Sequence, residues 1–541
     1  MAKNNIHPHE IDSLSIQLVG FDESSIIDIT DVVPHFNIYE SLFDMYATCD
    51  LIVADANHML SRLPIVGEEY VVFRYRTAGL NEQREEYELK IRSFKIYKLS
   101  ERVEDNEATN RYKLHGIDDH FFVNEGHNVN QSFVGQNCIS AAESVFKTYF
   151  VDPVEFRPFD KSGAKGPDTP AKNLVDNQRQ ISDKKYETAE IYQSQNNSNL
   201  IAPGLTPVET ITYLKNEALS KDQNDTSNYM FYQNHQGFHL KTLSQLKDQD
   251  FLYTYYLKDV GVSDTGEIEE GNIDNTNLSL RNSIISFSFR KTFDTMNNLE
   301  LGLYGNRIVA IDLLTKKYDE QIFSYNTEWP NLTPLESGPS AAKLMSDAEQ
   351  NMYRKIGSTQ TRYIATDLLS SSIPTGNITQ FSGNEHPSYK QTPYFYPIDK
   401  KDPDEMLDKL NGTLKNEDAK YRMVAFVRDD PKLKNPKLRH LKIGREVGSL
   451  ATLDSIVLDM TVPGNSELKA GDIIHVFIPD SHQTDKRYLN VLGQTEPRML
   501  VVDVRQSYLL SSGSFVTMIT CIKDSLNISI EKIAQLGADS G

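Results

Sequence analysis

The chain has 541 residues, with 56 lysines and arginines against 76 aspartates and glutamates, which gives a formal net charge of −20. At roughly 100–200 residues per domain, this length predicts three or four domains. Such an acidic surface argues against a protein whose main task is to hold nucleic acid, although an acidic channel would let DNA pass without binding it. No apolar run approaches the ~18 residues of a membrane helix, and residues 1–12 lack the apolar segment of a secretory signal.

The three cysteines, Cys49, Cys138 and Cys521, lie far apart in the sequence. An odd number of cysteines without a C-x-x-C pair indicates neither a disulfide framework nor a zinc site. Cys49 and Cys521 stand in strand-like runs, so we expect them to pack as small buried hydrophobic side chains.

The first part of the chain, residues 11–125, is predicted to be rich in β-strands. In LFDMYATCDLIV, residues 42–53, every second residue from Phe43 to Val53 is apolar. This period of two predicts one long strand with a single buried face.

Two further strands are expected at 69–76 and 84–99. Within the second of them the apolar phase slips by one residue between Ile91 and Phe94. Such a slip predicts a bulge or a sharp bend, as barrels use at their corners.

Residues 126–263 mix helical and strand patterns. A polar stretch at 158–200, rich in Lys, Asp, Asn, Ser and Gln, predicts a long surface loop or a mobile insertion. The elements expected around it are a helix at 135–150 with the apolar stripe Ile139, Ala142, Val145, Phe146 and Tyr149, a helix at 205–219 capped by Thr206, Pro207 and Glu209, and an aromatic hairpin at 228–243 that turns at Asn234, His235, Gln236 and Gly237.

The next part of the chain is less regular. Residues 264–277 are acidic and contain glycine, as linkers do, and β-like alternation follows up to residue 325. Residues 326–440 are interpreted as an insertion. Within it stand a second LTPLE box at 332–336, a helical stretch near 340–356, and a Tyr/Pro-rich run at 386–397 for which a contact surface and a simple ordered insertion are equally good interpretations.

Strong patterns return from residue 441 onward. Ile456, Leu458, Met460 and Val462 alternate and are expected to face a core. The expected elements are a helix at 439–453 and an antiparallel set of strands at 455–462, 471–479, 498–510 and 513–526.

Two β segments, 50–73 and 455–477, resemble each other. Each has a strand, a polar break, a leucine, and then a glycine followed by an acidic residue and a strand that ends in Val-Phe; Gly67 and Gly471 both stand six residues before that phenylalanine. The glycine permits a positive φ at the turn, and the acidic residue is expected to be exposed where the strand begins. Strand–turn–strand patterns of this kind also arise by chance. If this one marks a duplication, the chain holds two similar barrels, one early and one late.

The sequence signatures of common enzymes are missing: there is no P-loop, no H-E-x-x-H and no G-x-S-x-G motif. His115 and His120 flank Asp118 and Asp119, and imidazole with carboxylate suits several metals. A turn with polar surface groups is the favoured interpretation. His235 and His239 bracket the turn of the expected hairpin, where surface exposure or cross-strand pairing is favoured.

Paired carboxylates do not supply a glycosidase site either. Neighbouring residues on a strand point to opposite faces, whereas the two carboxyl groups of a glycosidase face one cleft. The doublets are Glu68/Glu69, Glu85/Glu86, Asp118/Asp119 and Glu269/Glu270. We therefore predict no catalytic, cofactor-binding or metal-binding residues, and a protein that is not an enzyme.

Three segments together resemble a known family, the central baseplate hub proteins of contractile-tailed bacteriophages. The early segment has an IYES start at 38–41, a strand that ends in Asp-Ala, and an L-P-I-x-G-E turn at 63–68. The middle segment is similar to the family's module of a helix followed by an aromatic hairpin. The late segment has VPGN at 462–465, L-x-x-G-D at 468–472 and a terminal KDS at 523–525, in the family's order.

The resemblance implies a mixed α+β, β-rich fold with two tail-tube-type β-barrels, separated by an α/β module and a large insertion. Three chains would form a ring of six barrels that joins a six-fold tail tube to a three-fold spike and lets DNA pass. The implied domains are a first barrel at 1–125, an α/β module at 126–263 with a mobile loop at 158–200, a discontinuous second barrel at 264–325 and 441–526, an insertion at 326–440, and a tail at 527–541.

The implied partners are two further copies of this chain, the tail tube protein, the spike protein and other baseplate proteins. DNA would pass through the lumen without stable nucleic-acid binding, and no membrane insertion is implied. The protein would belong to the virion, in the tail baseplate, after assembly in the host cytoplasm. Two alternatives remain open: a receptor- or carbohydrate-binding β protein of a fibre or baseplate arm, and a tail-associated hydrolase.

Overall fold

The computed structural model describes the chain in twenty-one segments. They are residues 11, 13–20, 26–56, 65–67, 69–81, 84–86, 89–106, 109–151, 194–198, 200–221, 226–257, 282–291, 305–312, 317–324, 332–335, 360–366, 396–397, 420–427, 437–453, 455–478 and 498–525. Among these residues, no helix has the length and apolar character needed to cross a bilayer.

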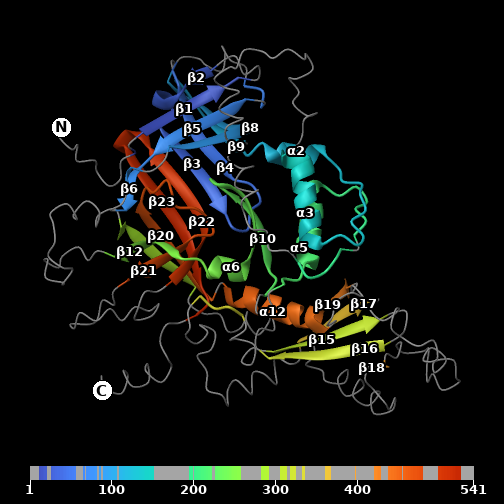
Figure 1. Cartoon of the computed structure of the whole chain (residues 1–541). Coiled ribbons are helices and arrows are strands. Elements are labelled where there is room, and N and C mark those ends of the chain that lie inside the picture. Colours follow the sequence, from blue (N-terminus) through green and yellow to red (C-terminus); the bar gives the residue numbers. More distant parts are fainter. Residues whose placement is uncertain are drawn as a thin grey trace, which may run out of the picture.

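A 14-stranded sheet dominates the fold, and it divides into two sets of strands. The first strand set, blue in Figure 1, comes from the N-terminal part of the chain. It contains β1 (Ser13–Val19), β2 (Ile26–Asp28), β3 (His35–Ser41), β4 (Thr48–Asp55), β5 (Tyr70–Arg76), β8 (Lys90–Asn106) and β9 (Thr109–Ile117), with the 3₁₀ turn η1 at Thr30–Val32 and the small hairpin β6 (Ala78–Asn81) and β7 (Arg84–Glu86).

The second strand set comes from two distant stretches of the chain, and it lies beside the first (Figure 1). It contains β12 (Phe251–Leu257), β13 (Ser283–Ile284), β14 (Ser286–Lys291), β20 (Ile456–Pro463), β21 (Ile473–Phe477), β22 (Arg498–Leu509) and β23 (Ser514–Lys523), with the 3₁₀ turn η6 at Leu510–Ser512. The sequence analysis assigned residues 251–257 to the preceding module. Their strand instead pairs with β21, which is more than 200 residues away and could not be identified from local pattern.

The two sets share one connectivity. When β1, β2, β3, β4, β5, β8 and β9 are matched in chain order with β12, β13, β14, β20, β21, β22 and β23, every pairing of the first set has a counterpart in the second. One strand differs in direction, because β1 runs antiparallel to β5 and β2 whereas β12 runs parallel to β21 and β13. The repeat therefore extends beyond the short echo visible in the sequence.

The register of the two sets agrees at one irregularity, although β8–β9 shifts twice more, between Ser100 and Val103 and between Glu104 and Asn106, where β22–β23 is continuous. The β8–β9 pairing skips one residue between Ile96 and Lys98, and the β22–β23 pairing skips one between Val501 and Asp503. Matching these irregularities aligns Asp50 of β4 with Asp459 of β20. Among the described strands the pairing closes neither set on itself, so the expected pair of closed barrels is observed as two open, matching strand sets.

Each set has its own core. The apolar face predicted for β20 is confirmed, because Ile456, Leu458, Met460 and Val462 are all buried. The core of the first set is unusual in one respect: Tyr508 and Phe515, which belong to β22 and β23, are part of it. The second set therefore completes the core of the first.

Two expectations for the first set need correction. The pattern at 42–53 does not form one strand: β4 begins at Thr48, and Phe43 lies in a loop with its side chain exposed. The phase slip before Phe94 is not a bulge either, since the β5–β8 register is continuous there. Arg92 occupies the buried position that an apolar residue would have filled, and its guanidinium pairs with Glu40.

A third region of helices and one hairpin packs around a separate core, to the right in Figure 1. Its capping predictions are confirmed: the Thr206 hydroxyl accepts a hydrogen bond from Glu209 N, the Glu209 carboxylate accepts one from Thr206 N, and Pro207 opens the helix. The elements are α2 (His120–Gly126), α3 (Cys138–Phe146) with the π-helical turn η2 (Lys147–Val151), α5 (Pro207–Glu217), β10 (Tyr229–Asn234) and β11 (Gly237–Thr242). The short helix α6 (Leu243–Lys247) follows the hairpin, but its Leu243 and Leu246 belong to another cluster, with Ile473 and Leu500 of the second set.

The chain between β14 and β20 forms a smaller, five-stranded sheet beside helix α12 (Lys437–Leu453), at the bottom of Figure 1. Its strands are β15 (Gly305–Asp312), β16 (Lys317–Ser324), β17 (Gln360–Thr366), β18 (Tyr396–Pro397) and β19 (Lys420–Val427). The sequence analysis placed 305–324 in the second barrel. These residues pair instead with strands of the insertion, and alternation alone does not identify a strand's partner.

Several expectations fall mostly outside the described residues: the loop at 158–200, the linker at 264–277, the helix near 340–356 and the run at 386–397. Residues 194–198 and 200–201 are described, and they make isolated bridges to Asn137, Ser132 and Ser220. In the second LTPLE box only 332–335 is described. Thr333 has a φ of +49°, which is not an N-cap geometry, and Leu335 N donates a hydrogen bond to Asp524.

Candidate functional site

The two strand sets meet where β3 pairs antiparallel with β22, from His35–Leu509 to Ser41–Asp503; we call this joint the seam. Its apolar side is formed by Phe36, which is fully buried. The Phe36 ring centroid lies 5.0 Å from that of Phe73 in the first set and 5.4 Å from that of Tyr508 in the second. The seam is thus a strand pairing backed by a shared core.

Polar side chains cross the seam on its other side. Ser41 Oγ donates to Asp503 Oδ1 over 2.6 Å, Arg505 Nε donates to Asn37 Oδ1 over 3.0 Å, and His35 Nε2 lies 3.1 Å from Ser507 Oγ. Each pair joins residues more than 460 positions apart in the sequence. Their geometry fixes the register of the two sets, since a slip of one residue would move every side chain to the opposite face.

Asp50 of β4 lies next to this network and accepts hydrogen bonds from Asn37 and Tyr39, while Lys113 Nζ approaches to 3.1 Å. Burial by itself would raise the pKa of Asp50, but the hydrogen bonds from Asn37, Lys113 and Tyr39 and the charge of Lys113 lower it below 3.8. Burial, together with the Asp50 charge, raises the pKa of Tyr39 to about 12. The carboxylate is therefore held in its charged form.

Two further buried contacts lie behind the seam. The Arg92 guanidinium pairs with Glu40 of β3, and both side chains are almost fully buried. The Tyr75 hydroxyl donates to Gln506 Oε1 of β22, and the Gln506 amide in turn donates to the Asn465 carbonyl. A buried ion pair contributes mainly when both partners are present, because either charge alone would be buried without compensation.

A glycine makes room for one of the side chains that cross between the sets. A Cβ at Gly464 would overlap the ring of Phe515, whose centroid lies 6.1 Å from that of Tyr75 in the first set. The next residues continue the joint, since Ser466 N donates to Thr77 Oγ1 over 3.1 Å. The VPGN segment thus forms the contact that lets β23 reach the first core.

The echoed turns before β5 and β21 also match in structure. Gly67 and Gly471 have φ values of +96° and +92°, as predicted for this turn. After Gly471 the prediction of an exposed acid is wrong, because Asp472 is buried and its carboxylate accepts from Lys469 N. The acid after Gly67 is Glu68, which lies outside the described residues. The next residue, Glu69, is buried and accepts from Val66 N and Gly67 N, so each described carboxylate binds backbone amides of its own turn.

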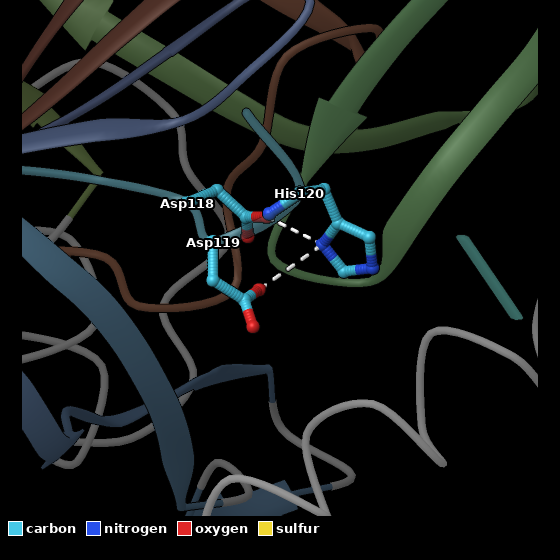
Figure 2. A group of neighbouring side chains, drawn as sticks. All are labelled: Asp118, Asp119 and His120. Carbon is cyan, nitrogen blue, oxygen red and sulfur yellow. Dashed lines mark hydrogen bonds and ion pairs between the residues drawn. The ribbon is translucent and has the colours of Figure 1, made fainter. Parts of the chain in front are cut away.

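The suspected metal group is a polar turn at the end of β9, but not a surface turn as the sequence analysis favoured, because Asp118 and His120 are buried. Figure 2 shows the carboxylates of Asp118 and Asp119 directed at the imidazole of His120, whose Nδ1 lies 2.6 Å from Asp118 Oδ1 and 3.3 Å from Asp119 Oδ1. Asp118 Oδ1 also accepts from His120 N, and Asp118 Oδ2 accepts from Gln233 Nε2 over 2.6 Å. Both oxygens of Asp118 are therefore already hydrogen-bonded.

These contacts give the group a structural role. Gln233 of β10 binds Asp118 with its amide nitrogen and accepts from Ala47 N with its amide oxygen, so it joins the hairpin to two loops of the first set. His115 is not part of the group, since its Nε2 lies 2.8 Å from Ser100 Oγ on β8. Within the part of the chain that the structure describes, this is the one cluster of three His, Cys, Asp or Glu side chains close enough to share an ion. The occupied oxygens of Asp118 fit a structural clamp better than a metal centre.

The remaining candidates are placed as follows. The hairpin is confirmed, and His239 pairs across it, with Nε2 2.9 Å from Asn234 Oδ1 and its ring stacked on Tyr232. Cys49, Cys138 and Cys521 are all buried as free thiols, and burial raises the pKa of Cys49 and Cys521.

The contacts that sequence reasoning missed are those of the seam. One signal was present: the break in alternation at Arg92 marked a charged residue at a position that should face the core. Its partner Glu40 could not be found from spacing, because the two residues lie on strands that are not neighbours in the chain. The arrangement as a whole can hold two domains in a fixed orientation.

Comparisons with known proteins give the following. No family model matches the chain, and no curated protein matches it. Among solved structures, it is similar to the tail protein from Neisseria meningitidis MC58, with 10% identity, a TM-score of 0.43, and coverage of 95% of this chain and 98% of that one. It is similar to the 43 kDa tail protein of prophage MuSo2 from Shewanella oneidensis, with 10% identity, a TM-score of 0.42, and coverage of 94% and 98%.

A third similar structure is the E. coli c3393 protein, described as a component of the type VI secretion system, with 8% identity, a TM-score of 0.33, and coverage of 91% and 73%. Phage tail proteins and a type VI secretion protein are thus among the solved structures that this chain resembles.

Proposed function

We propose that this chain is a structural protein of a phage tail, the central hub of the baseplate. Three copies form a ring of six strand sets, which joins the six-fold tail tube to the three-fold spike. The observation that supports this most directly is the repeat itself: seven strands with one connectivity occur twice in one chain and are joined by a seam. A chain with two matched domains lets a three-fold assembly present six similar surfaces.

The sequence motifs support the same assignment. The described parts of the segments that resemble hub proteins, at 38–41, 65–67 and 462–465, lie in or next to the matched strands and turns. Two of them form the glycine turn before β5 and the glycine contact with Phe515. The motifs therefore coincide with residues that the repeated fold requires.

The chemistry of the chain fits a structural role. The ionisable side chains of the seam and of the Asp118 group bind one another and the backbone, as scaffolding contacts do. The net charge of −20 suits the wall of a channel through which DNA passes without binding. The partners in this proposal are tail tube subunits on one face of the ring, the spike on the other, and further baseplate proteins around it, in a virion assembled in the host cytoplasm.

The test is the mass of the purified protein under native conditions. One chain weighs 61.5 kDa, and the proposal predicts a species of three times that mass at micromolar concentration. Electron-microscopy averages viewed down the ring axis should show six similar densities around a central opening. A protein that stays monomeric at micromolar concentration would contradict the proposal.

A further inference from the structure

The repeat within the chain indicates which strands of two neighbouring copies can pair with each other. In the first set, β3 has a strand on each edge, with β4 on one side and β22 on the other. Its counterpart in the second set is β14. Among the described strands, β14 pairs with β20 alone, so its outer edge has no strand beside it.

The counterpart of β22 is β8, and β8 has an open edge as well. The β22 edge that binds β21 near Leu500 continues and binds β3 from Asp503 to Leu509. The matching edge of β8 binds β5 only from Lys90 to Lys95. In the described part of the chain, no strand follows β5 along this edge beyond Ile96, where the counterpart of β3, a β14 strand, would be expected by analogy with the seam.

The side chains on these two edges differ from those of the seam in exposure. Phe36 of β3 is 0% exposed, whereas its counterpart Phe287 is 38% exposed and the neighbouring Ile285 is 46% exposed. On β8, Tyr97 is 50% and Val103 is 55% exposed. An edge strand that displays apolar side chains is a template for pairing with another chain.

We propose that β14 of one copy pairs antiparallel with the outer part of β8, residues 97–103, of the next copy, and that this joint reproduces the seam between chains. The occupant of each open edge is thus a second copy of this chain. The repeat also predicts the register. Asn37 faces Ser507 in the seam, and Ser288 is the counterpart of Asn37. Between Ser100 and Val103 the β8–β9 register shifts by one residue where β22–β23 does not, so we place Val103 as the counterpart of Ser507 through their partners Arg111 and Val516. Ser288 of one copy should then lie opposite Val103 of the next.

The contact is heterologous, because each copy offers β14 on one side and β8 on the other. A heterologous contact produces a closed ring when its rotation divides a full turn, and a filament when it does not. The strand pairing is derived from the repeat within the chain. That three copies close the ring rests on the function proposed above.

Disulfide cross-linking tests the pairing directly. The double variant Ser288→Cys/Val103→Cys places a thiol on each edge, at positions whose Cα atoms would lie within the roughly 4.4–6.8 Å that a disulfide spans. Both side chains are exposed in the single chain, and the three native cysteines are buried. After mild oxidation, non-reducing electrophoresis should show two-chain and three-chain species that disappear on reduction.

Matched controls make the test specific. The variants Ser288→Cys and Val103→Cys should give no ladder alone, and their mixture should give a two-chain species. The variant Ser288→Cys/Tyr97→Cys keeps a thiol on each edge but out of register, and it should cross-link much less. The variant Asn37→Cys/Ser507→Cys should form its disulfide within one chain, because it lies in the seam.

The outcomes separate the pairing from the proposed function. A native trimer in which Ser288→Cys/Val103→Cys does not cross-link would overturn the strand pairing and leave the three-fold ring intact. Cross-linking that ends at two chains would support the pairing and contradict the three-fold ring. A protein that is monomeric and does not cross-link would overturn both.

Discussion

The first and second strand sets have the same connectivity but differ in how completely they are covered. The edge of β3 in the first set is paired with β22 of the second set. Tyr508 of β22 and Phe515 of β23 also belong to the core of the first set. In the second set, β14 occupies the equivalent place with no strand on its outer edge among the described residues. The difference shows that burial at equivalent positions depends on the neighbouring domain as well as on the sequence of the strand.

The difference in burial is clearest for two equivalent residues, Phe36 of β3 and Phe287 of β14. They occupy equivalent positions, opposite the buried residues Leu51 and Met460 respectively. Phe36 is 0% exposed and Phe287 is 38% exposed. The same residue type therefore contributes to folding in one set, and we infer that it contributes to assembly in the other.

The largest expected effect follows from this pair. Phe36→Ala should lower the free energy of unfolding by about 3–5 kcal/mol, because it leaves a cavity in a closed core. Phe287→Ala should cost clearly less than Phe36→Ala in a dissociated chain, because its ring is already 38% exposed, and it should weaken the trimer. Denaturant unfolding at a fixed protein concentration measures the first effect, and native mass as a function of concentration measures the second.

Phe36→Ala should therefore have the larger effect on denaturant unfolding, and Phe287→Ala the larger effect on the native mass. If Phe287→Ala destabilises the dissociated chain as strongly as Phe36→Ala, the outer edge of β14 is covered within one chain. The inference about the next copy would then be wrong.

The next effect compares ion pairs in the two sets. Arg92→Met should lower stability by about 3–5 kcal/mol, since it leaves Glu40 buried without a counter-charge. In the second set, Arg290→Met breaks an ion pair with Asp459 in which the arginine side chain is 61% exposed. Screening by solvent limits that loss to about 1 kcal/mol or less.

Removing both buried charges tests whether Arg92→Met is unstable because the charge of Glu40 is left without a counter-charge. The double variant Arg92→Met/Glu40→Gln should recover much of the stability that Arg92→Met loses, as measured by the same denaturant unfolding. If the double variant is as unstable as the single one, the guanidinium acts through packing and not by compensating Glu40.

A smaller effect on stability is expected at Gly464, which leaves room for the Phe515 ring. Gly464→Ala should cost about 1–3 kcal/mol, because a Cβ there overlaps the ring and must move it out of the first core. The matched control is Gly126→Ala, where an added Cβ meets nothing within 4 Å and the loss should be close to zero. The equivalent position in the first set holds Asp55, opposite Asn110, so the first set needs no such space.

Local chemistry made part of this fold predictable. The capping box of α5, the two-residue turn of the β10–β11 hairpin and the buried face of β20 each depend on residues within a few positions of one another. The alternation from Phe43 to Ala47 gave a wrong strand. There the backbone is held by side chains, with Phe43 N donating to Ser41 Oγ and Ala47 N donating to Gln233.

The rest depended on pairing between distant segments. The strands β15 and β16 have the alternation of barrel strands, yet they pair within the insertion. The echo at Gly67 and Gly471 indicated a repeat, but not that β22 would pair with β3. A polar turn at Asp118 was predicted, but at the surface. Asp118 is buried and bonded to Gln233, 115 residues away, and such a distant contact leaves no local pattern.

The smallest expected effect is one of pH, at Asp50 beside the seam. Because the folded pKa lies below 3.8, the folded chain binds fewer protons at this carboxyl than the unfolded chain does. The stability that Asp50 contributes is therefore fully present above 3.8 and is lost as pH falls through the lowered folded pKa. Asp50→Asn should be less stable than the natural chain at neutral pH, and this gap should narrow as pH falls below 3.8, measured by denaturant midpoints across that range. A gap that stays constant with pH would mean that Asp50 acts through hydrogen-bond geometry alone, and that its charge does not contribute to holding β3 in register with β4.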